Sequence, residues 1–483
     1  MTLLPFRPRD RQTKTDRNVG NRSQPYLLVF FMTLAILGAM GSRLFYLQIV
    51  KGKEYQIRAD SNRIRLIPKK PIRGNIFDRN GQILATSRLA YSAFIWPIAK
   101  SKPQWPKVRE QLAEILEMEP QDIEKELEGV GADSPTLIRL AQDLTPAQIT
   151  ALEEFHQELD SVEVNIEPIR DYPNKSLGAH VLGYTGELSE EGLEERKNDG
   201  YRLGDIVGKI GIESYFESDL RGEWGGQRVE VNGAGKIVRL LEEQTPKAGQ
   251  DINLTLDSDL QKAAQNIISR KGRSGIVALD PETGEVLALA SNPTFDPNIF
   301  SRPIKQEEWD RLNSTGNPFI NRAVRGFPPA STFKVVTAVA GMETGKYPAS
   351  TVLGTYPYLS AGGVRFHEWN KAGFGPMGYV GALQWSSNTF FAQVGRGIGG
   401  ENLIKWSREF GFGEKSGIEI HEERAGLIAD NEWKMERFDR EWAVGDTINM
   451  SIGQGFTLAN TVQVARMFAV IANDGYLIRP HLQ

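Results

Sequence analysis

An apolar run lies near the N-terminus of the chain. Tyr26–Ser42 contains 17 residues without a charge, and after Arg43 the apolar pattern continues through Leu44–Leu47. A run of this length meets the lower limit for a helix that spans a bilayer, and the Arg43 side chain can extend to the interface. We therefore predict a single transmembrane anchor at residues 26–48. Two alternatives stay open: a cleaved signal peptide, for which Gly38–Gly41 offers small residues, and a buried core helix.

The next part of the chain changes from an extended to a helical pattern. Residues 54–90 are punctuated by proline and glycine, and Arg79–Gly81 is a hairpin-turn signal. Residues 103–160 carry a helical pattern, in which Thr145-Pro146 is a good N-cap followed by a first-turn proline. The apolar positions that share one helical face are Val108, Leu112, Ile115 and Leu116.

Extended patterns return in the second half. Residues 162–250 read as short strands with glycine turns, and Asp251–Leu256 alternates as a half-buried strand does. A helix is predicted at Leu260–Ile268, followed by a hairpin of Gly275–Leu279 and Glu285–Ala290. Helical patterns dominate from there to the end. The whole is typical of an α+β multidomain protein with a mixed α/β domain over residues 251–483.

Charge predicts the orientation of the anchor. Basic residues outnumber acidic ones before Tyr26: Arg7, Arg9, Arg11, Lys14, Arg17 and Arg22 against Asp10 and Asp16. By the positive-inside rule, residues 1–25 form a cytosolic basic tail, and everything after about residue 50 lies outside the cytoplasmic membrane. The protein is thus expected to be a single-pass protein of that membrane.

Composition excludes several classes of function. The formal net charge is −4, so nothing indicates a nucleic-acid partner. The absence of cysteine excludes disulfides, thiolate metal sites and a cysteine nucleophile. The five histidines are scattered and lack a metal-binding spacing, so we expect no metal and no cofactor.

Ser331 and Lys334 form a first candidate pair. Pro328 and Pro329 fit a helix start just before Ser331, and Lys334 follows one helical turn later on the same face. No further charge occurs until Glu343, which predicts a buried helix. Desolvation there favours the neutral lysine amine, which can take a proton from a hydroxyl and make it a nucleophile. Alone, the pair is more typical of an N-cap serine and a lysine that extends to solvent.

Ser386-Ser387-Asn388 forms a second candidate element. Ser386 and Asn388 on a loop could relay a proton and hydrogen-bond a substrate amide, although such a triplet alone is typical of a turn or a helix cap. In this order after Ser331, the two elements resemble the signature of serine acyltransferases, the penicillin-binding proteins and β-lactamases.

The resemblance extends over nearly the whole chain. The chain is similar to class B penicillin-binding proteins at Arg43–Gln48, Arg73–Gly81, Arg170–Pro173, Ala179–Tyr184, Gly211–Tyr215, Leu220–Gly222, Asn321–Ala323, Trp433-Lys434 and Gly453–Gly455. The spacing of these motifs is closest to the penicillin-binding protein 2 branch, which acts in cell elongation. The resemblance implies an elongated pedestal (dimerisation-type) domain over residues 49–250 and a β-lactamase-like transpeptidase domain from residue 251.

The same resemblance implies the reaction. In the family, a serine takes an acyl group from the D-Ala-D-Ala end of a peptidoglycan stem peptide and passes it to an amine on a neighbouring stem. Carried over to this sequence, Ser331 is the nucleophile, Lys334 its base, and Ser386 and Asn388 the proton-relay and amide-binding pair. β-Lactams are expected to bind this site. The implied protein partners are a RodA-type glycan polymerase and an MreC-type elongation protein, on the periplasmic side of the inner membrane.

One family motif, Lys-Thr/Ser-Gly on a strand, has no match in the expected place. The sequence has Lys-Ser-Gly only at Lys415–Gly417, which follows Asn388 too closely and is predicted to be a loop. We therefore expect the chain to end at Gln483 before the true motif, with the C-terminal part of the transpeptidase domain missing. A chain of this extent is expected to react slowly with penicillin.

Two alternative functions stay open at this point. A serine D,D-carboxypeptidase or β-lactamase-like hydrolase would share Ser331, Lys334 and Asn388, but it has no need of an anchor and a pedestal. A non-catalytic scaffold for a glycan polymerase would need the pedestal alone. The anchor and the pedestal motifs therefore argue against the hydrolase, whereas the missing third motif keeps the scaffold open.

Overall fold

The computed structural model describes residues 24–55, 64–132, 134, 137–196, 199–202, 204–231, 237–302, 304, 306–314 and 316–483. The basic tail predicted for residues 1–25 lies outside these residues except at its last two positions. The chain divides into two compact units, residues 1–68 with 226–244 and residues 69–225 with 245–483.

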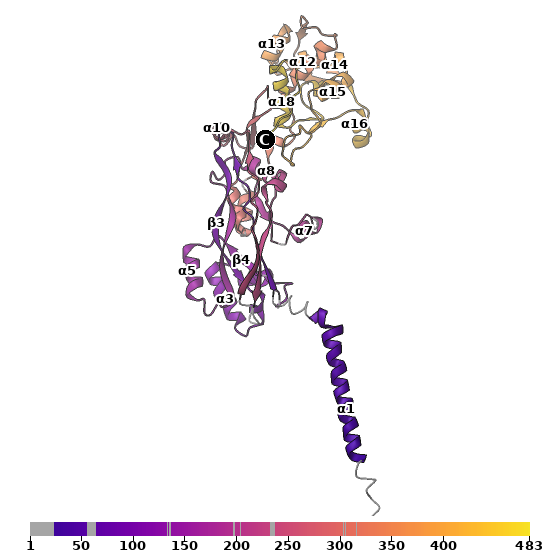
Figure 1. The fold of residues 1–483 in the computed structure, drawn as a ribbon. Helices are drawn as coiled ribbons and strands as arrows, with labels where there is room; N and C mark the ends of the chain where they lie inside the picture. The colour runs from indigo at the N-terminus through magenta and orange to yellow at the C-terminus, as the bar shows by residue number, and fades with distance from the viewer. Residues whose placement is uncertain are drawn as a thin grey trace, which may run out of the picture. The chain divides into compact units, whose positions relative to one another are not determined.

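The smaller unit contains a long apolar helix. α1 runs from Gln24 to Phe45 and continues as a π-helical segment, η1, over Tyr46–Val50 (Figure 1). In the described part of the chain, Tyr26–Val50 is the one helix that is long and apolar enough to cross a membrane, and its large apolar side chains are exposed. The apolar helix predicted at residues 26–48 is therefore confirmed. The unit also holds a sheet in the order β1 (Ile64–Lys69), β8 (Gly225–Val231), β9 (Ile237–Gln244).

The larger unit begins with a sheet built around one long strand. β3 (Ile83–Ile95) pairs antiparallel with β2 (Ile76–Phe77), β4 (Ile138–Gln142) and β5 (Val162–Asp171). β10 (Ile252–Asn253) adds to β2 in parallel. The predicted strand at residues 251–256 is thus real but shorter than the alternation indicates.

Three helices pack on this sheet, and they confirm most of the helical pattern. They are α3 (Trp105–Leu116), α4 (Pro120–Glu126) and α5 (Pro146–Glu154). All four predicted apolar positions of α3 contribute to the core beneath it. Thr145 caps α5 through a capping box, as its sequence indicates. The prediction of an all-helical stretch was wrong at β4, because pairing with β3 holds those residues extended.

Several short elements follow β5 in the chain. They are α6 (Ala179–Leu182), β6 (Thr185–Glu187), α7 (Glu190–Glu195), β7 (Ile206–Gly208), α8 (Gly211–Tyr215) and α9 (Glu217–Leu220), whereas η2 (Pro97–Ser101) lies earlier, between β3 and α3. Short helices therefore alternate with the short strands that the sequence predicts here. β6 and β7 form an antiparallel pair.

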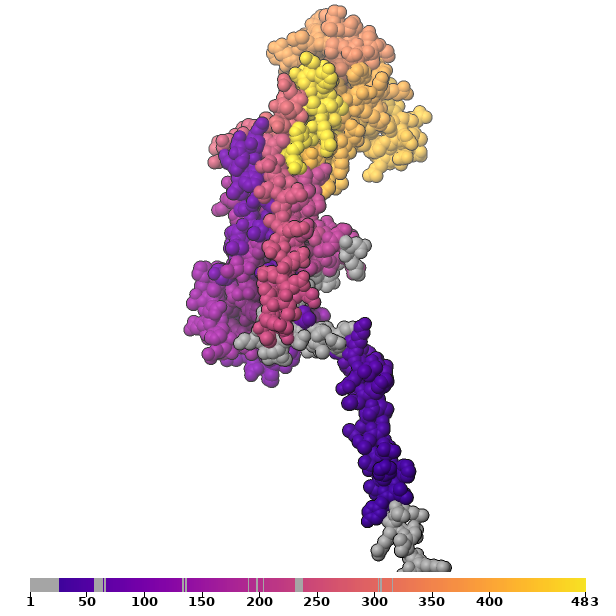
Figure 2. Space-filling model, in the orientation of Figure 1, coloured from indigo at the N-terminus to yellow at the C-terminus, as the bar shows by residue number. Residues whose placement is uncertain are grey.

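The predicted hairpin is present in the part of this unit that follows β10. β11 (Ser274–Leu279) and β12 (Val286–Asn292) pair antiparallel, and α10 (Ser258–Ile268) packs on them. The last described residues lie beside this hairpin (Figure 2), where His481 forms a bridge to Glu285. Leu482 is fully buried there.

The remaining residues form a helical group with short strands between the helices. Its helices are η3 (Pro297–Ser301), α11 (Gln306–Ser314), η4 (Arg322–Val324), η5 (Ala330–Phe333), α12 (Lys334–Glu343), α13 (Tyr379–Gln384), α14 (Asn388–Ile398), α15 (Gly400–Glu409), α16 (Asn431–Phe438), α17 (Val444–Ser451) and α18 (Thr461–Ala472). Its strands pair as β13 (Val352–Thr355) with β16 (Gly375–Gly378), β14 (Tyr358–Ala361) with β15 (Val364–His367), and β17 (Leu427–Ile428) with β18 (Thr457–Leu458).

α12 lies in the centre of the helical group. Its residues pack against α14, α15 and α18 in one hydrophobic core, and these helices gather at one end of the unit in Figure 1. Val336 and Ala340 are completely buried. The prediction of a buried helix after Ser331 is confirmed.

A second core connects the helical group with the sheet around β3. Its members come from both: Ile76, Leu84, Val181, Leu182, Ile212, Ile252 and Leu254 on one side, and Val286, Leu289, Ala323, Ile418, Val462 and Leu482 on the other. The two parts of the larger unit are therefore packed through continuous apolar contacts.

Candidate active site

Ser331 and Lys334 lie where η5 passes into α12. Ser331 is the second residue of this 3-10 turn and is exposed, whereas Lys334 opens α12 and is only 1% exposed. The helix was expected to begin before Ser331 as an α-helix, but its first turn is wound more tightly. In such a turn, residues three apart lie nearly above one another, so the two side chains share a face.

The turn before Ser331 is held by Gly453. Ala330 has a positive φ of 50°, an unfavourable conformation for a residue with a side chain, and its N–H donates to the Gly453 carbonyl at 2.9 Å. A Cβ on Gly453 would lie only 2.1 Å from the Ala330 oxygen. The Gly453–Gly455 motif therefore contributes a position where only glycine fits against the backbone that presents Ser331.

The structure brings Lys334 to the second candidate element. Its Nζ donates to the Ser386 carbonyl at 2.7 Å, to the Ser386 hydroxyl at 3.0 Å and to Asn388 Oδ1 at 2.8 Å. The Lys334 pKa falls from 10.5 to about 8, because burial disfavours the ammonium more than the nearby Glu368 carboxylate favours it. A lysine in this state loses its proton close to neutral pH.

Ser386–Asn388 combines a strained turn with a helix start. Ser386 has a positive φ of 52°, and Ser387 caps α14 by accepting from the Phe390 N–H at 3.2 Å. Asn388 is the first residue of α14, so the predicted loop holds only for the two serines. The Asn388 side chain also donates to the His367 carbonyl at 3.2 Å, which fixes the orientation of its amide.

Glu368 belongs to this site and is absent from the sequence prediction. Its carboxylate accepts hydrogen bonds from Ser387 Oγ at 2.6 Å, from Asn388 N at 3.0 Å and from Thr389 N at 2.9 Å. No sequence signal marks Glu368, because a glutamate just after a short, partly exposed strand is typical of a solvent-facing turn. Only tertiary contacts bury it.

A small hollow of about 230 Å³ adjoins Asn388. It is lined by Arg365, Phe366, His367, Asn388, Ala392, Ile448, Asn449, Ile452 and Gln454. Asn388 and Gln454 belong to two different motifs, so the hollow lies between the second candidate element and the loop that supports the Ser331 turn.

Lys415–Gly417 lies outside any strand, as predicted. The Ser416 N–H donates to both carboxylate oxygens of Glu423 at 3.0 Å, and Lys415 Nζ reaches the His421 carbonyl at 3.4 Å. Ile418, directly after it, belongs to the core that connects to the β3 sheet and not to the core around α12. Lys415 and Ser416 are thus engaged in local contacts, and the Gly417 carbonyl accepts hydrogen bonds from Arg479.

Three motifs of the predicted pedestal meet around Glu213, which is fully buried. These three pedestal motifs are Arg73–Gly81, Arg170–Pro173 with Ala179–Tyr184, and Gly211–Tyr215 with Leu220–Gly222. Arg73 Nε lies 2.6 Å from its Oε2, Arg170 Nε lies 2.6 Å from its Oε1, and the Tyr172 hydroxyl donates to Oε1 at 3.1 Å. Burial raises the pKa of Glu213, but Arg170 and Arg73 outweigh it and lower the pKa overall. A charged carboxylate therefore ties the motifs together.

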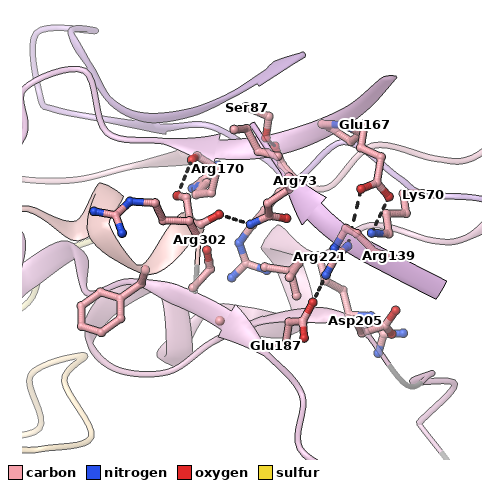
Figure 3. Close-up of a pocket in the computed structure, with 18 of the residues that line it drawn as sticks. Lys70, Arg73, Ser87, Arg139, Glu167, Arg170, Glu187, Asp205, Arg221 and Arg302 are labelled. Atoms are coloured by element: carbon pink, nitrogen blue, oxygen red, sulfur yellow. Dashed lines mark hydrogen bonds and ion pairs between the residues drawn. The ribbon is translucent and has the colours of Figure 1, made fainter. Parts of the chain in front are cut away.

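A hollow of about 410 Å³ lies beside this network (Figure 3). Many of its residues are charged, and several are paired: Glu167 lies 2.7 Å from Lys70 and 3.5 Å from Arg139. The one labelled hydroxyl, Ser87, lies 3.4 Å from the Arg73 carbonyl. The labelled lysine of this hollow, Lys70, is held by the Glu167 carboxylate, whereas the acceptors of Lys334 are neutral.

In the described residues, no group of three or more histidine, aspartate or glutamate side chains is placed to hold a metal ion. The first site brings together the Ser386 hydroxyl, the Lys334 amine, the Asn388 amide and the Glu368 carboxylate.

Comparisons with known proteins match most of the chain. The penicillin-binding protein dimerisation domain matches residues 68–254, and the penicillin-binding protein transpeptidase domain matches residues 274–483. The chain belongs to the penicillin-binding proteins. Ser331, Lys334, Ser386 and Asn388 all lie within the matched transpeptidase domain of this penicillin-binding protein.

Curated relatives show to which class of penicillin-binding proteins this chain belongs. It is 36% identical to the peptidoglycan D,D-transpeptidase MrdA of Escherichia coli K12 over 465 residues, which cover 94% of this chain and 73% of the relative. MrdA of Haemophilus influenzae is 36% identical over 481 residues, covering 98% and 73%. The penicillin-binding protein is thus of class B, similar to MrdA and to penicillin-binding protein 2.

Solved structures agree with this placement. The complex of penicillin-binding protein 2 with MreC from Helicobacter pylori has a TM-score of 0.77 at 31% identity, covering 87% of this chain and 79% of that one. A structure of a peptidoglycan synthase complex, which coordinates polymerization and crosslinking, has a TM-score of 0.66 at 32% identity. The match covers 95% of this chain and 79% of that one. This penicillin-binding protein is a serine-type peptidoglycan D,D-transpeptidase of cell-wall synthesis. Of the functions that the sequence leaves open, the transpeptidase is the one that is confirmed.

Proposed function

We propose that Ser331 is the nucleophile of this transpeptidase and that Lys334 is its general base. The observation that carries the proposal is the buried Lys334 amine, which is hydrogen-bonded to Ser386 and Asn388 and has a pKa of about 8. A buried amine that is held by acceptors and close to its pKa suits proton transfer at neutral pH.

In the first half-reaction, the Ser331 hydroxyl attacks the carbonyl between the two terminal D-alanines of a stem peptide, and Lys334 takes the hydroxyl proton. Backbone N–H groups at the start of a helical turn have no acceptor within the helix and can stabilise the oxyanion. The Ser386 hydroxyl, 3.0 Å from the Lys334 amine, can pass the proton to the departing D-alanine amine. The product is an acyl-Ser331 ester.

In the second half-reaction, an amine of a neighbouring stem attacks the ester, loses a proton to the same Lys334–Ser386 pair and releases the Ser331 hydroxyl. Asn388 suits the binding of a substrate amide beside the ester. A β-lactam would acylate Ser331 by the same first step, with its ring amide in place of the terminal peptide bond.

A labelling experiment tests the nucleophile. Ser331→Ala should abolish covalent labelling by a fluorescent penicillin while the circular dichroism spectrum stays unchanged. Ser416→Ala, in the Lys-Ser-Gly loop, serves as the control and should keep labelling. Label on the Ser331→Ala protein that peptide mapping assigns to another serine would overturn the proposal.

We further propose a place and partners for the protein. The apolar helix would anchor it as a single-pass protein of the inner membrane, with the transpeptidase domain on the periplasmic side. A Helicobacter pylori relative was solved with MreC, and another similar structure is a peptidoglycan synthase complex. These similarities support an MreC-type elongation protein and a RodA-type glycan polymerase as partners, to be tested by co-purification from membranes.

A further inference from the structure

Glu368 is a carboxylate that is surrounded by hydrogen-bond donors. Only 5% of the residue is exposed. Its Oε1 accepts from the Asn388 N–H at 3.0 Å and the Trp369 N–H at 3.1 Å. Its Oε2 accepts from Ser387 Oγ at 2.6 Å, and from Thr389 N and Oγ1, both at 2.9 Å. Both oxygens are therefore fully used by donors from the start of α14 and from its own neighbour.

These contacts make Glu368 an external cap of α14. The first N–H groups of a helix have no intrahelical acceptor, and the helix dipole favours a negative charge beside them. Glu368 accepts from two of these groups, those of Asn388 and Thr389, while Ser387 accepts from the third, that of Phe390. Burial raises the Glu368 pKa, but the hydrogen bonds outweigh it and lower the pKa overall. The carboxylate is therefore charged at neutral pH.

The same segment holds the reacting amine. Asn388 gives its N–H to Glu368 and its side-chain oxygen to Lys334, so a shift of the Glu368 carboxylate would move the acceptor of the Lys334 amine. Ser386, the other acceptor, directly precedes the capped turn.

Among the groups around Lys334, the Glu368 carboxylate provides the negative charge that favours its ammonium form. Side chains that face the amine from α14 and its preceding turn are neutral: Ser386, Asn388 and the Phe391 ring, whose centroid lies 5.9 Å away. In the part of the chain that the structure describes, Glu368 is the one charged group whose field on Lys334 is resolved. It comes from the connection between β15 and β16, outside both α12 and α14.

We infer that Glu368 is a positioning residue for acyl transfer, which holds the Ser386–Asn388 turn in the geometry that grips the Lys334 amine. The inference rests on the proposed role of Lys334. The hydrogen bonds of Glu368 go to Trp369 and to the start of α14, so it acts through the turn and through its charge. Two measurable effects follow, one on the rate of acylation and one on its pH dependence.

The experiment measures acylation of the full chain by a fluorescent penicillin across a pH range that brackets the Lys334 pKa of about 8. Glu368→Gln should slow acylation by about 100-fold, the size expected when a reacting group is misplaced by about 1 Å. It should also move the midpoint of the profile to lower pH, because the charge that favours the ammonium is gone. Glu368→Asp keeps the charge and should slow acylation with an unchanged midpoint.

Two further variants separate positioning from general damage. Ser387→Ala removes one hydrogen bond from Glu368 without altering charge, so it should slow acylation and leave the midpoint in place. Glu401→Gln, which alters an exposed acidic residue in the first turn of α15, should change neither quantity. Thermal melting of each variant reports folding. If Glu368→Gln does not fold, Glu368→Asp and Ser387→Ala decide the matter, and wild-type rates in both overturn the inference.

The outcomes are distinguishable from a failure of the proposed function. A Glu368→Gln profile with wild-type rate and midpoint would overturn the positioning role only. A lower rate with an unmoved midpoint would show a purely structural link between the β15–β16 connection and α14, and would also overturn it. Label that persists in Ser331→Ala would instead overturn the nucleophile assignment, whatever Glu368 does.

Discussion

At the scale of single residues, the site is defined by a lysine that is buried with three acceptors and by a serine that stays exposed. Lys334 is 1% exposed, and its contacts to Ser386 and Asn388 range from 2.7 to 3.0 Å. Burial makes the ammonium unfavourable, and the acceptors keep the amine from turning away. Substitution of Lys334 can therefore show whether the lysine acts as a base or only stabilises the fold.

Lys334→Arg should be nearly as damaging to acylation as Lys334→Ala, with a loss of about 100- to 10,000-fold, the usual contribution of a general base. Arginine keeps the positive charge but does not release its proton at accessible pH. The measurement is the acylation rate by penicillin, with Lys346→Arg, an exposed lysine just after α12, as the control. Wild-type rates in Lys334→Arg would contradict the base role.

The wild-type acylation rate should rise with pH and level off above about 8, where the Lys334 amine is neutral. The sign follows from burial, which lowers the pKa from 10.5 and so places the loss of the proton in this range. A stopped-flow series at constant ionic strength measures the profile. A rate that falls over the same range would rule out the neutral amine as the reactive form.

The sequence predicts some of these residues and cannot predict others. Ser331, Lys334, Ser386 and Asn388 follow from motifs whose order and residue types reflect the chemistry. Glu368 does not, because its function depends on burial against a helix start that is distant in the sequence until the chain folds. Glu368 accepts hydrogen bonds from backbone N–H groups, which every residue type except proline provides. The residue types of its partners therefore leave no motif in the sequence that would point to Glu368.

At the scale of elements, the turn that presents Ser331 depends on Gly453 as much as on α12. Gly453→Ala should destabilise the protein by more than the roughly 1 kcal/mol of an unfavourable backbone conformation, because its Cβ would also lie 2.1 Å from the Ala330 oxygen. The turn must then shift, so acylation should slow as well. Denaturant unfolding and the acylation rate check both effects.

Gly345→Ala is the matched control for this substitution. Gly345 also has a positive φ, 70°, and follows α12, but no atom lies within 4 Å of its missing Cβ. It should show the backbone effect without slower acylation. Equal effects of the two variants on acylation would show that the contact of Gly453 with Ala330 has no special role.

Helices and hairpins whose caps or turns are visible in the sequence could be predicted. Short strands that are stabilised only by pairing with a distant strand could not. α5 has a capping box, and the β11–β12 hairpin has a turn closed by the Asp280 N–H and the Glu285 carbonyl at 2.9 Å. In contrast, β17 and β18 have two residues each and exist only because they pair with one another. The pattern of so short a strand is indistinguishable from that of a loop.

At the scale of the whole molecule, the three pedestal motifs are remote in sequence and meet only through folding. Glu213→Gln should destabilise the protein by about 3–5 kcal/mol, because it leaves the buried Arg170 without its counter-charge and leaves Arg73 with Glu217 alone. Glu158→Gln, which breaks an exposed pair with Lys107, should change stability by less than about 1 kcal/mol. Urea unfolding measures both.

The sign of the pH dependence follows from the Glu213 pKa, which is lower in the folded protein than its ordinary value of 4.5. The stabilisation from Glu213 is therefore complete above that value and is lost as pH falls through the lowered folded pKa. Glu213→Gln should lose this part of the acid sensitivity. An unchanged difference in stability between the two proteins across that window would contradict the assignment.

Topology is the remaining prediction at this scale. The transpeptidase domain should lie outside the cytoplasmic membrane, because the basic residues before Tyr26 favour the cytoplasmic side. Protease added to intact spheroplasts should digest the bulk of the protein, as it does in lysed cells. Full protection in the intact spheroplasts would reverse the orientation.

The core that contains Leu254 on one side and Val462 on the other has a practical consequence for protein engineering. If the gene were divided between the two family domains, this single apolar core would be split. Each of the two protein halves would then expose an apolar surface to water. Domain swaps between related enzymes should therefore succeed only when the residues on both sides of this interior are exchanged together. The boundary between the two matched domains is useful for sequence alignment, but it does not separate two independent hydrophobic cores.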